Sequence, residues 1–111
     1  MATAMIDSTI RALSDPTRRR TVELLSEGPA RAGDLARDIG VPAATMSKHL
    51  RVLLGAGVVV DRRSSADARV RVFQLQEGPM VGLQAWLDQL QAHWDVQLGA
   101  FKTHIEARGP Q

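Results

Sequence analysis

The sequence predicts a mainly α-helical fold with one small β-hairpin. Apolar residues recur every three or four positions over most of the 111 residues, which is the period of an amphipathic helix. The exception is the segment 58–75, where two β-branched runs flank a polar loop at 64–68. A hydrophobic fraction of 44% is enough for the core of one domain of ordinary size. We therefore expect residues 1–111 to form a single domain.

An apolar stripe and a capping sequence predict the first two helices. Ile6 and Ile10 lie on one side of a helix expected over about 5–13. Asp15 and Pro16 then match an N-cap followed by proline at the first helical position. The arginine run at 18–20 near the start of this second helix has two interpretations. It is either a solvated face with ion pairs to nearby carboxylates or a contact to a nucleic-acid backbone.

Residues 31–54 predict two further short helices joined by a tight turn. Gly40 ends the first of them, because glycine enters the left-handed conformation at a helix C-terminus without steric cost. Pro42 suits the first turn of the next helix, where its missing N–H is no loss. The core face of that helix then holds three residues at i, i+4 and i+7: Met46, Leu50 and Leu53. This pattern is typical of a helix-turn-helix.

The opposite face of this helix carries small and polar side chains that suit the major groove of DNA. Lys48 matches guanine O6 and N7 or a phosphate, whereas Arg51, one turn later, suits the backbone. His49 stays open between reading a base and packing against the core beside Leu50. The predicted DNA-contacting residues of this helix are Ala43, Ala44, Thr45, Ser47, Lys48, His49 and Arg51.

A hairpin directly after such a helix is a wing, expected over about 58–75. Four arginines flank its tip, where they are expected to reach phosphates or a minor groove: Arg62, Arg63, Arg69 and Arg71. Residues 41–75 hold six basic and two acidic residues, although the whole chain has a net charge of only +2. This local positive charge favours double-stranded DNA as the partner of a winged helix-turn-helix. A winged module that binds protein through the same face is the alternative.

The last predicted helix, over about 80–108, is too long to be buried by so small a body. Its apolar stripe follows spacings of four and three residues, close to a coiled-coil seam. We therefore expect it to pack on a second copy of itself, together with the opening helix. The predicted interface residues are Ile6, Ile10, Leu83, Leu87, Leu90, Trp94, Leu98 and Phe101. An intramolecular cap on the core is the alternative, and it would leave a tryptophan-lined patch exposed.

Several protein classes are disfavoured by what the chain lacks. It has no cysteine, which excludes disulfides and thiolate metal sites. It shows no glycine-rich phosphate loop after a strand and no dense carboxylate or histidine cluster, so we expect neither an enzyme nor a cofactor. The apolar runs are too short to span a membrane, and the N-terminus does not resemble a signal peptide. The expected location is the cytoplasm.

Two segments resemble a known family. Leu13–Arg20 (LSDPTRRR) and Ser47–Gly57 (SKHLRVLLGAG), followed by the arginine-rich wing, are similar to the ArsR-type winged-helix repressors of bacteria. The resemblance covers about residues 5–76, and the tail is similar to a branch of the family with paired tryptophans. It implies a homodimer, joined through its first and last helices, that occupies a near-palindromic operator. Many members of the family release DNA when a metal binds, whereas others bind no known ligand.

The metal sites of that family are absent or incomplete in this sequence. Its Cys-x-Cys-Asp-Leu motif is replaced by Arg31-Ala32-Gly33-Asp34-Leu35, which holds no soft ligand. A second family site on the last helix would retain only His93 and His104, with Gln91 and Ala107 at its other two positions. We therefore expect no metal, and a metal-responsive repressor that uses His93 and His104 is the alternative. The sequence does not identify an inducer.

Overall fold

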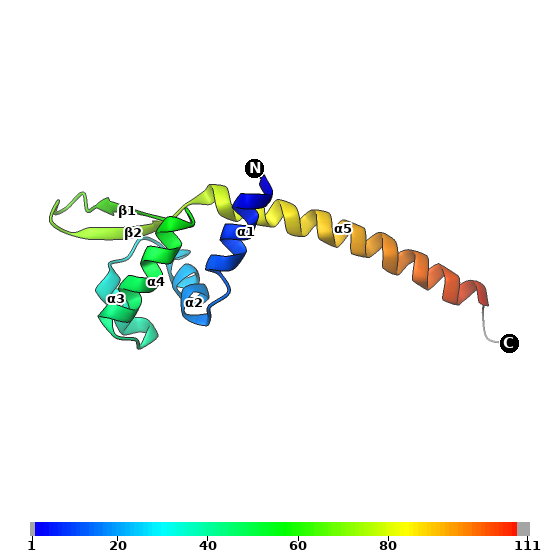
Figure 1. Ribbon diagram of the computed structural model, residues 1–111, viewed down its shortest axis with the longest axis horizontal. Coiled ribbons are helices and arrows are strands. Elements are labelled where there is room, and N and C mark those ends of the chain that lie inside the picture. The colour runs from blue at the N-terminus through cyan, green and yellow to red at the C-terminus, as the bar shows by residue number, and fades with distance from the viewer. Residues whose placement is uncertain (1, 109–111) are drawn as a thin grey trace.

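The computed structural model describes residues 2–108 as five helices and one antiparallel hairpin (Figure 1). The elements are α1 (Ala2–Ala12), α2 (Pro16–Leu25), α3 (Ala32–Ile39), α4 (Ala43–Gly55), β1 (Val59–Arg63), β2 (Arg71–Leu75) and α5 (Glu77–Arg108). Helices α1–α4 and the hairpin form one body, from which α5 projects (Figure 1). The predicted class is confirmed: a mainly helical winged helix-turn-helix whose N- and C-terminal helices are in contact.

The core lies where α2, α3 and α4 meet the hairpin. Met46, Leu50 and Leu53 are at most 2% exposed, so the predicted inner face of α4 is confirmed. They pack with buried residues of the other elements: Leu25, Leu35, Ala36, Val58, Val59 and Phe73. Two backbone hydrogen bonds between Ala30 and Phe73, of 3.0 and 2.8 Å, also join β2 to the loop before α3. The hairpin is therefore held beside the helix-turn-helix.

The predicted cap and turn residues have the expected geometry. Oδ1 of Asp15 accepts hydrogen bonds from the N–H groups of Thr17 and Arg18, at 2.8 and 3.1 Å. Partial burial raises the pKa of the Asp15 carboxyl, but these hydrogen bonds lower it by a larger amount. The net shift of the pKa is therefore downward. Gly40 has φ 85° and ψ 38°, and its N–H donates to the Ala36 carbonyl at 2.8 Å. The turn between α3 and α4 therefore depends on a left-handed residue.

Four element boundaries differ from the prediction. Helix α1 spans Ala2–Ala12 instead of 5–13. Pro42 precedes α4 as its N-cap, with ψ 150°, instead of lying in the first turn. Strand β2 begins two residues later than predicted, because residues 68 and 69 form a turn. Oδ1 of Asp67 stabilises this turn by accepting a hydrogen bond from the Arg69 N–H at 3.0 Å. Helix α5 begins at Glu77, since a proline in the first turn has no hydrogen bond to lose.

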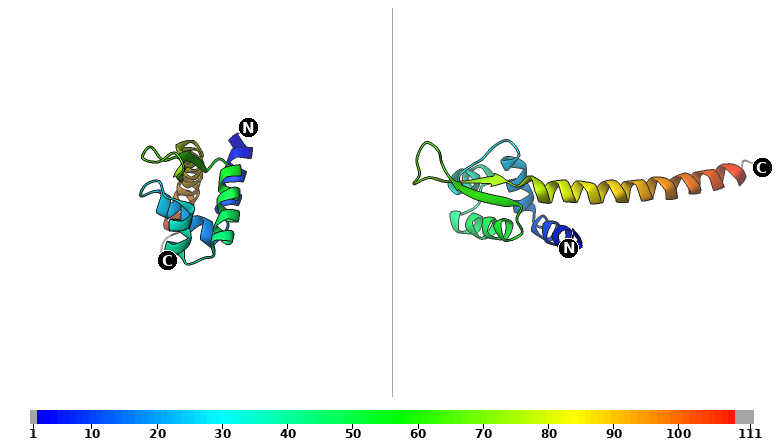
Figure 2. Two further views of the ribbon diagram at one scale, coloured as in Figure 1. Left: turned by 90° about the vertical axis from the view of Figure 1, so that its left-hand side faces the viewer. Right: turned by 90° about the horizontal axis from the view of Figure 1, so that it is seen from above.

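Helix α5 extends far beyond the body. Figure 2 shows α1 beside only the first turns of α5, and the rest of α5 projects alone. The radius of gyration is 19.7 Å, whereas a compact chain of this length would have about 13 Å. None of the described residues of α5 is buried. Within residues 2–108, no helix combines the length and the hydropathy that a membrane span requires.

We expect Gly40→Ala to destabilise the fold by about 1–2 kcal/mol, because an L side chain pays that cost in the left-handed region. A Cβ at Gly40 would meet no atom within 4 Å, so the cost is that of the backbone alone. Urea unfolding at fixed protein concentration measures it. Gly55→Ala is the matched control, since Gly55 is helical and equally open. An equal loss in both variants would contradict the left-handed explanation.

Candidate nucleic-acid interface

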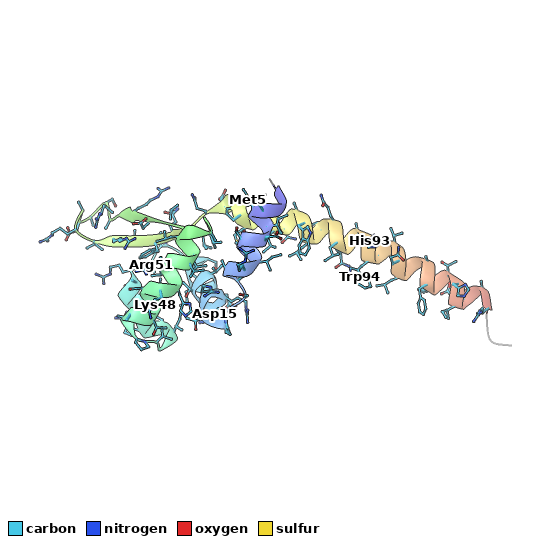
Figure 3. The ribbon with its side chains drawn as sticks, viewed as in Figure 1. Met5, Asp15, Lys48, Arg51, His93 and Trp94 are labelled. Carbon is cyan, nitrogen blue, oxygen red and sulfur yellow. The ribbon has the colours of Figure 1, made fainter. Side chains whose placement is uncertain are left out.

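The outward face of α4 is exposed along its first three turns. Thr45 is half-buried, and the other predicted contacts on this face are open to solvent: Ala43, Ala44, Ser47, Lys48 and Arg51. Figure 3 places Lys48 and Arg51 along α4, far from His93 and Trp94 on the projecting part of α5. The two alanines leave room for close approach at the N-terminal end of the helix. Because the opposite face is locked in the core, this face is held rigidly outward.

His49 occupies a different position from its neighbours on α4. Its side chain is 17% exposed and lies against the start of α2, where Nδ1 is 3.2 Å from a guanidinium nitrogen of Arg18. The structure thus brings His49 together with Arg18 and Asp15, two residues outside the predicted DNA-contacting set. Sequence spacing gave no sign of this contact, since 31 residues separate Arg18 from His49.

The two strands of the wing place Arg71 under tight restraint. Arg71 donates from Nε to Oδ2 of Asp61 at 2.7 Å, and its guanidinium lies 4.8 Å from the centre of the Phe73 ring. The hydrogen bond from Arg71 holds the pKa of the Asp61 carboxyl below its ordinary value, and the charge of Arg63 adds to this effect. Arg63 and Arg71 are directly opposed across the strands. Asp61 therefore offsets the repulsion between two like charges.

The other wing arginines are more open. Among the described residues, neither Arg62 nor Arg63 makes a side-chain hydrogen bond or an ion pair. Arg69 has a 90% exposed side chain and pairs with Asp67 at 3.1 Å, so it lies in the tip turn instead of in a strand. The four arginines thus differ in freedom, with Arg62 and Arg63 the most available to a polyanion.

A cleft of about 390 Å³ separates α4 from the wing. Arg51 from α4 and Arg71 from β2 both line it, above an apolar floor. The remaining lining residues are Ala32, Ser47, Leu50, Leu54 and Phe73. The recognition face and the wing therefore present arginines to one shared space, which suits the backbone of a bound duplex.

The arginine run at the start of α2 is largely engaged by the chain itself. Arg20 pairs with Glu23 at 3.1 Å, which confirms an ion pair that the solvated interpretation expected. Arg19 donates to the Leu13 carbonyl at 2.9 Å. Arg18 donates from Nε to the Ala12 carbonyl at 2.6 Å. Each of these three side chains therefore already has a partner within the chain.

The predicted seam residues fall into two groups. Ile6 and Leu83 are half-buried within the chain, near the contact between α1 and α5. The others are exposed: Ile10, Leu87, Leu90, Trp94, Leu98 and Phe101. His93 and His104 are also exposed on α5. In the part of the chain that the structure describes, no three His, Asp or Glu residues are grouped so that they could hold a metal ion.

Comparison with known proteins agrees with this geometry. Residues 13–62 match the family model described as a helix-turn-helix domain. The chain is 37% identical to the HTH-type transcriptional regulator Rv2034 of Mycobacterium tuberculosis, over 93% of this chain and 91% of that protein. It is 38% identical to the transcriptional repressor SdpR of Bacillus subtilis, over 52% of this chain and 64% of SdpR. A solved ArsR family transcriptional regulator, RHA00566, superposes with a TM-score of 0.72 at 29% identity, covering 84% of this chain and 93% of that one.

The helix-turn-helix, its exposed polar face and the adjoining basic wing define a winged-helix DNA-binding protein. The chain belongs to the ArsR family of helix-turn-helix transcriptional regulators. It is a regulator of transcription and not an enzyme.

Proposed function

We propose that this chain forms one DNA-binding domain of a homodimeric repressor that occupies a near-palindromic operator and is not switched by cysteine-bound metal. The main observation in support of this proposal is the exposed outer face of α4 beside the basic wing. In the proposed complex, the N-terminal half of α4 enters the major groove. The wing arginines contact phosphates or the adjacent minor groove. Repression is supported by the similarity to SdpR, which is itself a transcriptional repressor.

The homodimer is supported by the apolar stripe of α5. Trp94 is 53% exposed and Phe101 is 63% exposed, although both lie on the repeating apolar face of the helix. Monomers rarely expose continuous apolar patches beyond a few hundred Å². A second copy of α5 would cover the stripe along its length. Twofold symmetry would then present two copies of α4 to half-sites about 34 Å apart.

The absence of cysteine removes the thiolate switch, because positions 31 and 33 hold arginine and glycine. A function at a promoter would place the protein in the cytoplasm with the bacterial chromosome.

The decisive experiment is sequencing of genomic fragments bound by the purified protein, in the presence of zinc and in the presence of EDTA. We expect enrichment of near-palindromic sites with half-sites about one helical turn apart, unchanged between the two conditions. Titration of the recovered site should show a steep loss of affinity between about 50 and 200 mM salt. Equal affinity for all sequences, or a flat salt response, would favour a protein-binding winged module instead. Loss of binding in zinc would favour the alternative, a metal-responsive repressor that uses His93 and His104.

We expect Arg63→Ala to weaken binding to all duplexes by a similar factor. Arg63 has no ion pair within the described residues, so its charge is available to a phosphate. The slope of log affinity against log salt should fall by about two for a dimer that loses two phosphate contacts. Arg20→Ala is the control, because Arg20 is already paired with Glu23. A change in sequence preference with an unaltered slope would contradict this role of the wing.

A further inference from the structure

The two segments that carry the resemblance to the ArsR family meet in the fold through Arg18 and His49. Nη1 of Arg18 lies 3.2 Å from Nδ1 of His49, and Nε2 of His49 lies 3.9 Å from Oδ1 of Asp15. These groups come from the start of α2 and the middle of α4. A polar cluster therefore connects the recognition helix to the helix before the helix-turn-helix.

The chemistry of Arg18 assigns a role to the ring nitrogen of His49 that faces it. A guanidinium can only donate hydrogen bonds, so Nδ1 of His49 must accept. The other ring nitrogen, Nε2, faces the Asp15 carboxylate, with 3.9 Å between Nε2 and Oδ1. Asp15 is held in turn by the backbone N–H groups of Thr17 and Arg18. The imidazole is thus oriented by a hydrogen bond at Nδ1, and the Asp15 carboxylate lies near its other nitrogen.

The same guanidinium also reaches the end of α1. Nε of Arg18 donates to the carbonyl of Ala12, the last residue of α1, at 2.6 Å. Nη2 lies 3.4 Å from the carbonyl of Arg11. The last carbonyls of a helix lack intrahelical donors and favour a cation. One side chain therefore joins the C-terminus of α1 to the middle of α4.

Apart from Ala12, which is buried in the core with Leu50 and Leu53, direct contact between α1 and α4 is sparse. A cleft of about 200 Å³ lies between them, lined by Ser8, Arg11, Ala12, Val52, Gly55 and Ala56. Direct packing across this gap is weak, so it does little to fix the angle between the helices. The link through Arg18 and His49 bridges the two helices at one end of the gap.

We propose that Arg18 and His49 are positioning residues that hold the recognition helix at a set angle to α1 and thereby set the spacing of the half-sites. The inference rests on the proposed dimer, because α1 packs on α5 and α5 carries the seam. If α1 and α5 define the twofold frame, the angle between α1 and α4 determines where each α4 meets DNA. Arg18 and His49 need not touch the duplex to do this.

The first test uses the duplex that the wild-type protein selects, with and without two base pairs inserted between its half-sites. The insertion rotates the half-sites by roughly 70°, and the wild type should lose about 100-fold in affinity because both subunits can no longer bind together. In Arg18→Ala and His49→Ala, the same insertion should lower affinity by less than about tenfold, because a more loosely held α4 can bind at both spacings. An unchanged 100-fold penalty in both variants would overturn the proposal.

Matched variants separate positioning from general damage. Arg20→Ala removes an arginine that pairs with Glu23 on α2, and it should keep the wild-type spacing penalty. His49→Gln offers an acceptor and a donor in a similar place, and it should restore the penalty to within about threefold of wild type. The double variant of Arg18 and His49 should show the same reduced spacing penalty as either single variant, because both residues belong to one link. Failure of glutamine to restore the penalty would show that the hydrogen bonds are not the cause.

A second readout needs no DNA. Residual dipolar couplings of the free protein report the orientation of each helix relative to the others. In the wild type, α1 and α4 should fit one alignment tensor, whereas in Arg18→Ala they should require two. A single shared tensor in Arg18→Ala would refute the positioning role, even if DNA binding by the wild type had failed. Failure of DNA binding alone would refute only the repressor function.

Discussion

Trp94→Glu should convert the protein from a dimer into a single chain of 12.1 kDa. Trp94 lies mid-way along the apolar stripe of α5 and is 53% exposed, so the proposed seam would bury it against the partner. Placing a carboxylate there costs several kcal/mol of desolvation on top of the lost apolar contact. Sedimentation equilibrium over a range of concentrations measures the change in mass.

The same substitution should weaken operator binding by at least about 100-fold, because two linked half-site contacts become independent. Far-UV circular dichroism should also fall, since an isolated helical segment is marginal in water. The matched control is Val96→Glu. Val96 is 69% exposed and lies almost opposite Trp94 around the helix, off the stripe. A Trp94→Glu dimer, or an equal effect of both variants, would contradict the seam.

Lys48→Ala should relax sequence preference more than it lowers affinity for random DNA. Lys48 is exposed on the outer face of α4, one turn from Arg51, and makes no side-chain hydrogen bond or ion pair within the described residues. A lost base contact costs about 1–3 kcal/mol of discrimination, or roughly 5- to 150-fold. Competition between the selected site and single-base variants measures that ratio. Ser47→Ala should act in the same direction.

The control for Lys48 is Lys102→Ala, which removes the same charge from α5. Lys102 lies 3.9 Å from Glu106 and far along the projecting helix. Its removal should leave the discrimination ratio unchanged. If Lys48→Ala lowers affinity for every duplex equally and flattens the salt response, then Lys48 binds a phosphate instead of a base.

Much of the helix-turn-helix can be predicted from local sequence patterns. Met46, Leu50 and Leu53 repeat at helical spacing, and burial of that face turns Ser47 and Lys48 outward. Gly40 marks the turn because the conformation that the chain needs there is cheap only for glycine. Such features depend on neighbours in sequence, so a single chain was enough to predict them.

Other features of the candidate site depend on groups far apart in the chain. The link between Arg18 and His49 joins residues 31 positions apart, and the restraint of Arg71 by Asp61 crosses the hairpin. The prediction treated the four wing arginines as equivalent, because composition reports charge but not partners. Only the folded hairpin shows that Arg71 is held by Asp61 and Arg69 by Asp67, whereas Arg62 and Arg63 make no ion pair within the described residues.

Periodicity and turn chemistry were thus sufficient for the winged helix-turn-helix, the direction of its outer face and the apolar stripe of α5. Tertiary structure decided how α4 is attached to α1, which arginines remain available and how far α5 extends from the body. The physical reason is the range of the interactions. Helical burial and left-handed turns are set within a few residues, whereas a hydrogen bond between distant side chains exists only after the helices have packed.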